Sequence, residues 1–199
     1  MNVRLQYDIE FLAGVYYDHR LQLNSYSANL GLLTKTTDSS SHNIALDRLK
    51  HFVHGELANT VFVVQQNQDR AEMMHMMGIN VTTLPEEPVD QIVGMMLYCK
   101  LNAIMEGRMA ITRLDLSSLL GDSVWYMHDE DDALGPFRSD GWWNQPTVEH
   151  YSIADGIAND NVVRVTPNAW YELGLTWPEQ ETESTANTVV YADFSRNEN

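Results

Sequence analysis

The chain has 199 residues and carries 28 Asp and Glu against 12 Lys and Arg, a formal net charge of −16. This acid excess argues against direct nucleic-acid binding, which needs Lys and Arg to neutralise phosphates. No apolar run reaches the roughly 20 residues of a membrane helix, the N-terminus lacks the features of a signal peptide, and the single Cys99 excludes an internal disulfide and a Cys-based zinc cluster. We therefore expect a cytoplasmic protein of one domain, without a membrane partner.

The first 36 residues predict an antiparallel β-meander. Apolar residues alternate with polar ones at the start, the pattern of a strand with one wet face: Val3, Leu5, Tyr7, Ile9 and Phe11. We place turns at Gly14 and at Asn24–Ser25, which separate two further strands, one over 15–23 and one that runs to Thr34.

Residues 43–116 alternate helices with strands. The expected elements are a helix over 43–58 with Asn43 as its N-cap, a strand over 60–64, a helix over 69–77 closed by Gly78, a strand over 79–84, a long helix from Pro85–Pro88 to Gly107, and a strand over 109–116. Such alternation implies crossover units and a mainly parallel sheet. We expect an α/β (or α+β) fold in which the meander joins a βαβαβ-like mixed sheet.

The chain changes character after residue 127. Residues 128–199 hold 14 acids and 3 bases, against 14 acids and 9 bases in residues 1–127, and all five tryptophans follow residue 124. The Gly-, Pro- and Trp-rich stretch 133–146 predicts an ordered loop, and 123–127, 161–165 and 188–194 are candidate strands. We divide the chain into an α/β body, 1–127, and an acidic Trp-rich section, 128–199, packed on the same domain.

One candidate site is a run of four carboxylates, Asp129–Asp132, that follows His128 and a predicted strand. Hard cations take carboxylate oxygens, and acids at strand ends hold Mg²⁺ in many phosphoryl-transfer enzymes. The candidate ligands of a divalent metal are His128, Asp129, Asp131, Glu86 and Glu87. Solvated surface charge explains the acid run without a metal, and charge compensation at a helix N-terminus explains Glu86, Glu87 and Asp90.

Other candidate residues admit two explanations each. His51 and His54 lie three apart on a predicted helix and could bind a metal, but histidines on a wet helix face fit equally well. Cys99 lies among apolar residues, as a buried small residue does. Met73, Met76 and Met77 share a helix face, with Met74 turned away; core packing or a subunit contact explains them.

The tryptophans beside the acids suit a basic partner, through charge and cation–π attraction. The alternative is that they cover the end of the sheet. The candidate interaction residues are Trp125, Trp142 and Trp143 together with Asp129, Glu130, Asp131 and Asp132.

Three segments of the chain carry a family resemblance: NIALDRLKHFV (43–53), LPEEPVDQIVGMMLYCKLNAIMEGR (84–108) and LGDSVWYMHDEDD (120–132). Together with the residues between them, these segments resemble uncharacterised proteins encoded by tailed bacteriophages. The resemblance implies expression in a bacterial host cytoplasm and implies no reaction.

Our first hypothesis is a non-enzymatic, acidic interaction protein that binds and modulates a host or phage protein, such as a nucleic-acid-binding one, through its acidic C-terminal third. A Mg²⁺- or Mn²⁺-dependent hydrolase of a nucleotide or phosphate ester is the second, with a divalent metal as its cofactor. The third is a structural or assembly component that forms a homo-oligomer.

Overall fold

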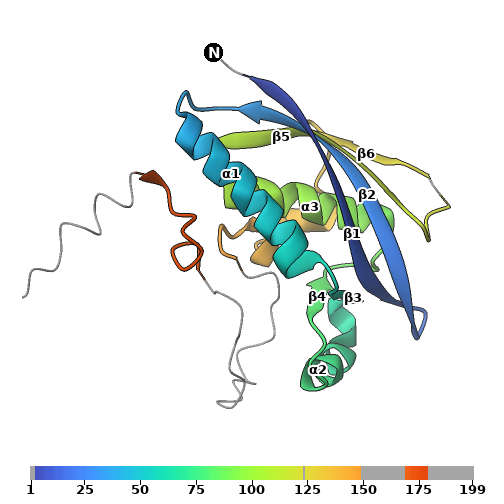
Figure 1. The fold of residues 1–199 in the computed structure, drawn as a ribbon. Helices are drawn as coiled ribbons and strands as arrows, with labels where there is room; N and C mark the ends of the chain where they lie inside the picture. The colour runs from blue at the N-terminus through green and yellow to red at the C-terminus, as the bar shows by residue number, and fades with distance from the viewer. Residues whose placement is uncertain (1–2, 123, 149–168, 179–199) are drawn as a thin grey trace, which may run out of the picture.

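The computed structural model describes residues 3–122, 124–148 and 169–178 (Figure 1). A six-stranded sheet runs in the order β4-β3-β1-β2-β5-β6. Strands β1 (Arg4–Tyr17), β2 (Arg20–Thr34), β5 (Met109–Ser118) and β6 (Tyr126–Asp129) pair antiparallel, while β3 (Val61–Val64) and β4 (Val81–Leu84) run parallel to β1. The expected mixed sheet, with an antiparallel N-terminal unit, is confirmed.

The N-terminal unit is one long hairpin, with its turn at Asp18 and His19. Both residues have positive φ, 48° and 58°, as a two-residue type I′ hairpin turn requires. Gly14 lies inside β1, where a Cβ would stand 2.9 Å from Val61 Cγ2, so glycine allows β3 to approach. Asn24 lies inside β2 and accepts a hydrogen bond from the Leu120 amide at 3.0 Å. The turns placed at Gly14 and Asn24–Ser25 are therefore wrong.

Helix α1 (Ser39–His51) begins four residues before the expected start. Asp38 is the N-cap, and its carboxylate accepts from the amides of Ser40 and Ser41 at 3.2 and 2.8 Å. Asn43 is inside the helix. A π-helical turn, Phe52–Leu57, follows directly.

Helix α2 (Gln68–Met76) connects β3 to β4, and α3 (Asp90–Met105) connects β4 to β5. The faces of α2 differ from the expectation: Met74 is buried, while Met73, Met76 and Met77 are exposed. The expectation that Met73, Met76 and Met77 pack in the core is therefore wrong. Helix α2 is short and packs through a small cluster that contains Ala71 and Met74, so its other face has nothing to cover it among the described residues.

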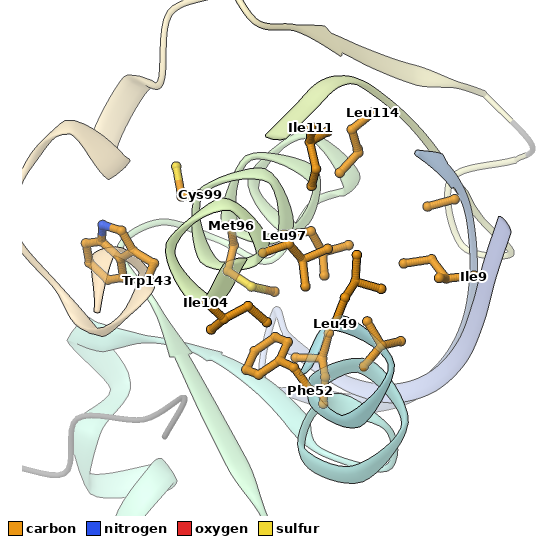
Figure 2. Close-up of a cluster of buried hydrophobic side chains, with 14 of the residues drawn as sticks. Ile9, Leu49, Phe52, Met96, Leu97, Cys99, Ile104, Ile111, Leu114 and Trp143 are labelled. Atoms are coloured by element: carbon orange, nitrogen blue, oxygen red, sulfur yellow. The ribbon is translucent and has the colours of Figure 1, made fainter. Parts of the chain in front are cut away.

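The core lies between the sheet and the helices α1 and α3. Figure 2 shows Leu49 and Phe52 meeting Met96, Leu97 and Ile104 of α3, with strand residues closing the cluster. These side chains are almost fully buried. No helix among the described residues is long and apolar enough to cross a membrane.

The loop after β6 is ordered, with 3₁₀ turns at Gly135–Arg138 and Trp142–Asn144. The Trp142 indole donates to the Thr83 carbonyl at 3.0 Å, so the loop covers β4. The buried Lys100 ammonium donates to three of its carbonyls, those of Trp142, Gln145 and Thr147, at 3.2, 2.9 and 2.8 Å. These bonds hold the loop against α3.

A C-terminal segment, residues 169–178, packs on α1 through Arg48. The Arg48 guanidinium lies 4.8 Å from the Trp170 ring centroid and 3.9 Å from that of Trp177. It also donates to the Leu175 carbonyl at 2.8 Å and pairs with Glu106 at 2.6 Å. The candidate strands 161–165 and 188–194 lie outside the described residues.

Candidate interaction surface

The two faces of the sheet have different surroundings. Phe11 and Tyr26 stack at 5.0 Å in the core, and the His128 ring lies 4.4 Å from Tyr98 of α3. Since strand side chains alternate, their neighbours point to the opposite side, where no described helix packs. We call this side the open face: Arg4, Gln6, Asp8, Glu10, Leu12, Leu23, Ser25, Ser27, Asn29, Arg113, Asp115, Ser117, Met127 and Asp129.

Carboxylates set the charge of the open face. Arg113 donates to both oxygens of Asp115 at 2.9 and 3.0 Å, so these two charges largely cancel. The pKa of Arg113 is raised by this bond. The Asp8 carboxylate accepts from the side-chain amide of Asn29 at 2.6 Å, a bond that brings no positive charge to it. With Glu10 and Asp129, this leaves the middle of the face and its β6 edge acidic.

Apolar side chains are exposed beside these acids. Leu12 and Leu23 of the hairpin are 47% and 69% exposed, and Trp125 and Met127 at β6 are 50% and 58% exposed. Leu119 follows β5 and bonds through its amide to the Ser25 carbonyl at 3.0 Å, which brings another exposed leucine to this end. Large apolar groups ringed by charge are typical of interaction surfaces.

The acidic turn, Asp129–Asp132, closes β6. The Asp129 amide donates to the Asp132 carboxylate at 2.9 Å, and the Glu130 amide donates to the Thr112 carbonyl at 3.1 Å. All four side chains are exposed. The backbone of the turn is therefore fixed to β5, while its carboxylates face solvent.

His128 secures β6 to α3 from the other side. The side chain is 1% exposed, its Nδ1 lies 2.9 Å from the Tyr126 hydroxyl, and Nε2 has no hydrogen-bond partner among the described residues. Burial lowers the pKa of His128, against a weaker opposing effect of Asp132 and Asp129. The imidazole is thus a buried, neutral packing group that fixes the strand carrying the acids.

The candidate metal ligands are not brought together. His128 packs against Tyr98, which is eight residues, or about 12 Å, along α3 from Asp90. Glu86 and Glu87 precede α3 and are exposed. In the described ranges, no three His, Cys, Asp or Glu side chains form a group that could hold a metal ion. The ligand set His128, Asp129, Asp131, Glu86 and Glu87 stays a prediction from the sequence.

Asp90 serves the fold at the start of α3. Its carboxylate accepts from the Ser118 hydroxyl at 2.7 Å, which ties the helix to the end of β5. Gly121 packs so closely on this carboxylate that a Cβ there would collide with it. These contacts explain Asp90 as a structural residue, without a role in ligand binding.

The two histidines of α1 and the following turn point to different surroundings. The backbone becomes π-helical at Phe52, and this places His51 beside Glu56, five residues on, with Nε2 and Oε1 3.5 Å apart. His54 is exposed. Cys99 is buried, which raises the pKa of its thiol to about 11, so it is protonated at neutral pH.

Of the tryptophans predicted to contact a partner, Trp125 alone is at the surface. Trp142 and Trp143 are 7% and 3% exposed, because the loop after β6 turns them onto α3 and β4. They cover the core and are not surface contacts in this structure. Leu12 and Leu23 were not predicted from the sequence, although they are apolar residues at solvent-facing positions of their strands.

Comparisons with known proteins give fold-level likenesses only. No protein-family model matches the chain, and no curated protein matches it. Solved structures similar to it include the uncharacterized protein WS1659 from Wolinella succinogenes, with 9% identity, a TM-score of 0.49, and coverage of 66% of this chain and 99% of that one. A catalytic-residue mutant of Plasmodium vivax 6-pyruvoyltetrahydropterin synthase has 10% identity and a TM-score of 0.41, covering 64% and 97%. At these TM-scores, neither likeness carries an inference about activity.

Proposed function

We propose that this chain is a non-enzymatic interaction protein that binds a protein partner with a basic surface. The contact area is the open face near β6, with Trp125 and the acidic turn. The main support for this proposal is that Trp125 and Met127 are exposed directly beside the four exposed carboxylates of Asp129–Asp132.

Charge supports a basic partner. The acidic turn and the open face of a protein with net charge −16 attract a positive surface and speed its approach at low salt. Trp125 adds a large ring that can receive Lys or Arg through cation–π attraction. Charge would speed the association of the two proteins, and burial of the apolar side chains would stabilise the complex.

A nucleic-acid-binding protein is the natural class of partner, because its functional surface is basic. The resemblance to phage-encoded proteins makes a bacterial or phage protein of this class the first to test. Binding would cover the partner's basic surface and so modulate its function.

The hydrolase hypothesis has less support. It needs carboxylates that converge on a cation, and the described acids of the turn face solvent separately. It stays a prediction from the acid run alone. The assembly hypothesis rests on a different surface, the methionines of α2.

Capture from a bacterial lysate tests the proposal. The full chain is immobilised at low and high salt, and each captured protein is purified and titrated directly. We expect a basic partner whose binding weakens with salt and is lost in Asp129→Asn/Asp131→Asn. Asp69→Asn/Glu72→Gln is the matched control, because it removes two negative charges on α2, at the β3–β4 end of the sheet, and should leave binding unchanged. If no captured protein binds with salt dependence, or if both double variants weaken binding equally, the proposal is wrong.

A further inference from the structure

Helix α2 presents three methionines to solvent. Met73, Met76 and Met77 are 40%, 71% and 63% exposed, while Ala71 and Met74 on the other side pack into the small cluster against β3 and β4. Positions i, i+3 and i+4 of a helix lie on one face, so the three thioethers form a continuous apolar stripe.

The stripe lies on an ordered helix end. The Gly78 amide donates to the His75 carbonyl at 2.9 Å, and the Ile79 amide donates to the Met74 carbonyl at 3.0 Å. Gly78 has φ +78°, the left-handed conformation that closes a helix in this pattern. Since the last turn is capped, the backbone that carries the exposed methionines is fixed, and a partner would not need to order it.

Local charge favours a second copy of this chain over a basic partner at this site. Helix α2 holds Asp69 and Glu72 against Arg70, so the formal charge of its acids and its arginine is about −1. Two copies with a charge of −16 each repel one another most where their acidic surfaces meet. Contact through α2 brings little like charge together, whereas contact between two open faces brings acids against acids.

A short apolar stripe is also self-complementary. A two-fold axis across it places two α2 helices antiparallel, so the same side chains meet from both copies. Arg70 of each copy then approaches the C-terminal end of the other helix, where a cation is favoured. Thioether side chains are flexible enough to fill the space between two such helices.

We infer that α2 is the contact through which two copies of this chain pair, burying Met73, Met76 and Met77 of each. One helix pair is smaller than the roughly 1,600 Å² of a standard stable interface. The dimer is therefore reversible and depends on concentration. Helix α2 packs at the β3–β4 end of the sheet, away from β6 (Figure 1). Pairing through α2 therefore leaves the open face near β6 free in each copy.

Sedimentation equilibrium of the full chain over a wide concentration range tests this inference. Moderate salt should be present, to screen the net charge. We expect the average mass to rise towards twice that of the monomer, and Met76→Lys/Met77→Lys to weaken pairing at least about tenfold. Val3→Lys/Asn43→Lys is the matched control, because it adds the same two positive charges at exposed positions that lie outside α2 and outside the proposed binding surface.

Two results would overturn the inference. The first is a wild-type chain that stays monomeric at every concentration. The second is pairing that persists in Met76→Lys/Met77→Lys, or that Val3→Lys/Asn43→Lys weakens equally. Thermal melting of each variant checks that it is folded. Failure of self-association leaves the proposed binding of a basic partner untouched, since that proposal concerns the opposite end of the sheet.

Discussion

The Nδ1 atom of His128 lies 2.9 Å from the hydroxyl of Tyr126, and both side chains face α3 from the four-residue edge strand β6. The next residues along the same strand, Met127 and Asp129, face the open side. The buried side chains of β6 therefore hold in place the strand that carries the exposed side chains of the candidate surface.

The first prediction concerns pH. Burial lowers the pKa of His128 from 6.5, so the unfolded chain binds its proton more readily than the folded chain does. Stability from the neutral imidazole is therefore present above pH 6.5 and is lost as the pH falls through the lower, folded pKa. Urea unfolding at pH 7.5 and pH 5.5 should show this loss in the wild type and a smaller loss in His128→Phe. Replacement of an exposed histidine, His54→Gln, should leave the pH dependence unchanged. If His128→Phe loses as much unfolding free energy between pH 7.5 and pH 5.5 as the wild type does, the role of the buried imidazole is contradicted.

The second prediction concerns Gly94 of α3. A Cβ at this position would stand 2.5 Å from the Tyr126 ring, so Gly94→Ala should push β6 away from the helix. We expect a loss of about 1–3 kcal/mol in unfolding free energy, despite the better helix propensity of alanine. Combining Gly94→Ala with Tyr126→Ala should cost less than the two single changes added together, as measured by denaturant unfolding. Strict additivity would argue against the contact.

The third prediction separates the two kinds of tryptophan. Trp142→Ala removes a buried ring from the core and should cost about 3–5 kcal/mol of unfolding free energy. Trp125→Ala changes a half-exposed side chain, so it should alter stability by less than about 0.5 kcal/mol while weakening partner binding. Denaturant unfolding and titration of a captured partner measure both effects. A Trp125→Ala variant that binds normally would remove this residue from the surface.

The fourth prediction concerns Arg48, which joins α1 to the segment 169–178. Its guanidinium is buried between Trp170 and Trp177 and pairs with Glu106. Arg48→Ala leaves the Glu106 carboxylate without this partner and removes the cation over Trp170, while Arg108 stays 4.5 Å from the Trp177 ring centroid. It should cost about 3 kcal/mol, with increased proteolysis of this segment. Arg70→Ala, on the surface of α2, should cost less than about 0.5 kcal/mol. Equal stability of the two variants would contradict the anchoring role.

The regular elements could be predicted where a local signal dominates. The valines of β3, the glycine cap of α2 and the apolar run of α3 each identify their element. The length of the hairpin strands could not be predicted, because a glycine such as Gly14 is typical of a turn. Here it lies inside β1, where it makes room for Val61 of β3, 47 residues further along the chain.

The candidate surface was predictable in part. The acid run and Trp125 are visible in the sequence, and both are exposed. Trp142 and Trp143 have the same composition signal but are buried, because burial depends on how the loop packs against α3 and β4. The contribution of Leu12 and Leu23 depends on strand pairing, which places them on the face that the described helices leave uncovered.

Hydrogen–deuterium exchange of the full chain, alone and with a captured basic partner, identifies the backbone amides that the partner protects. If the partner binds the open face near β6, exchange should slow at β6, at the acidic turn Asp129–Asp132 and in the Leu119–Trp125 connection. Exchange in α2 should be unchanged by the partner at protein concentrations where the chain is monomeric. Protection confined to α1, α2 or the loop after β6, with none at β6 or the acidic turn, would contradict binding through the open face.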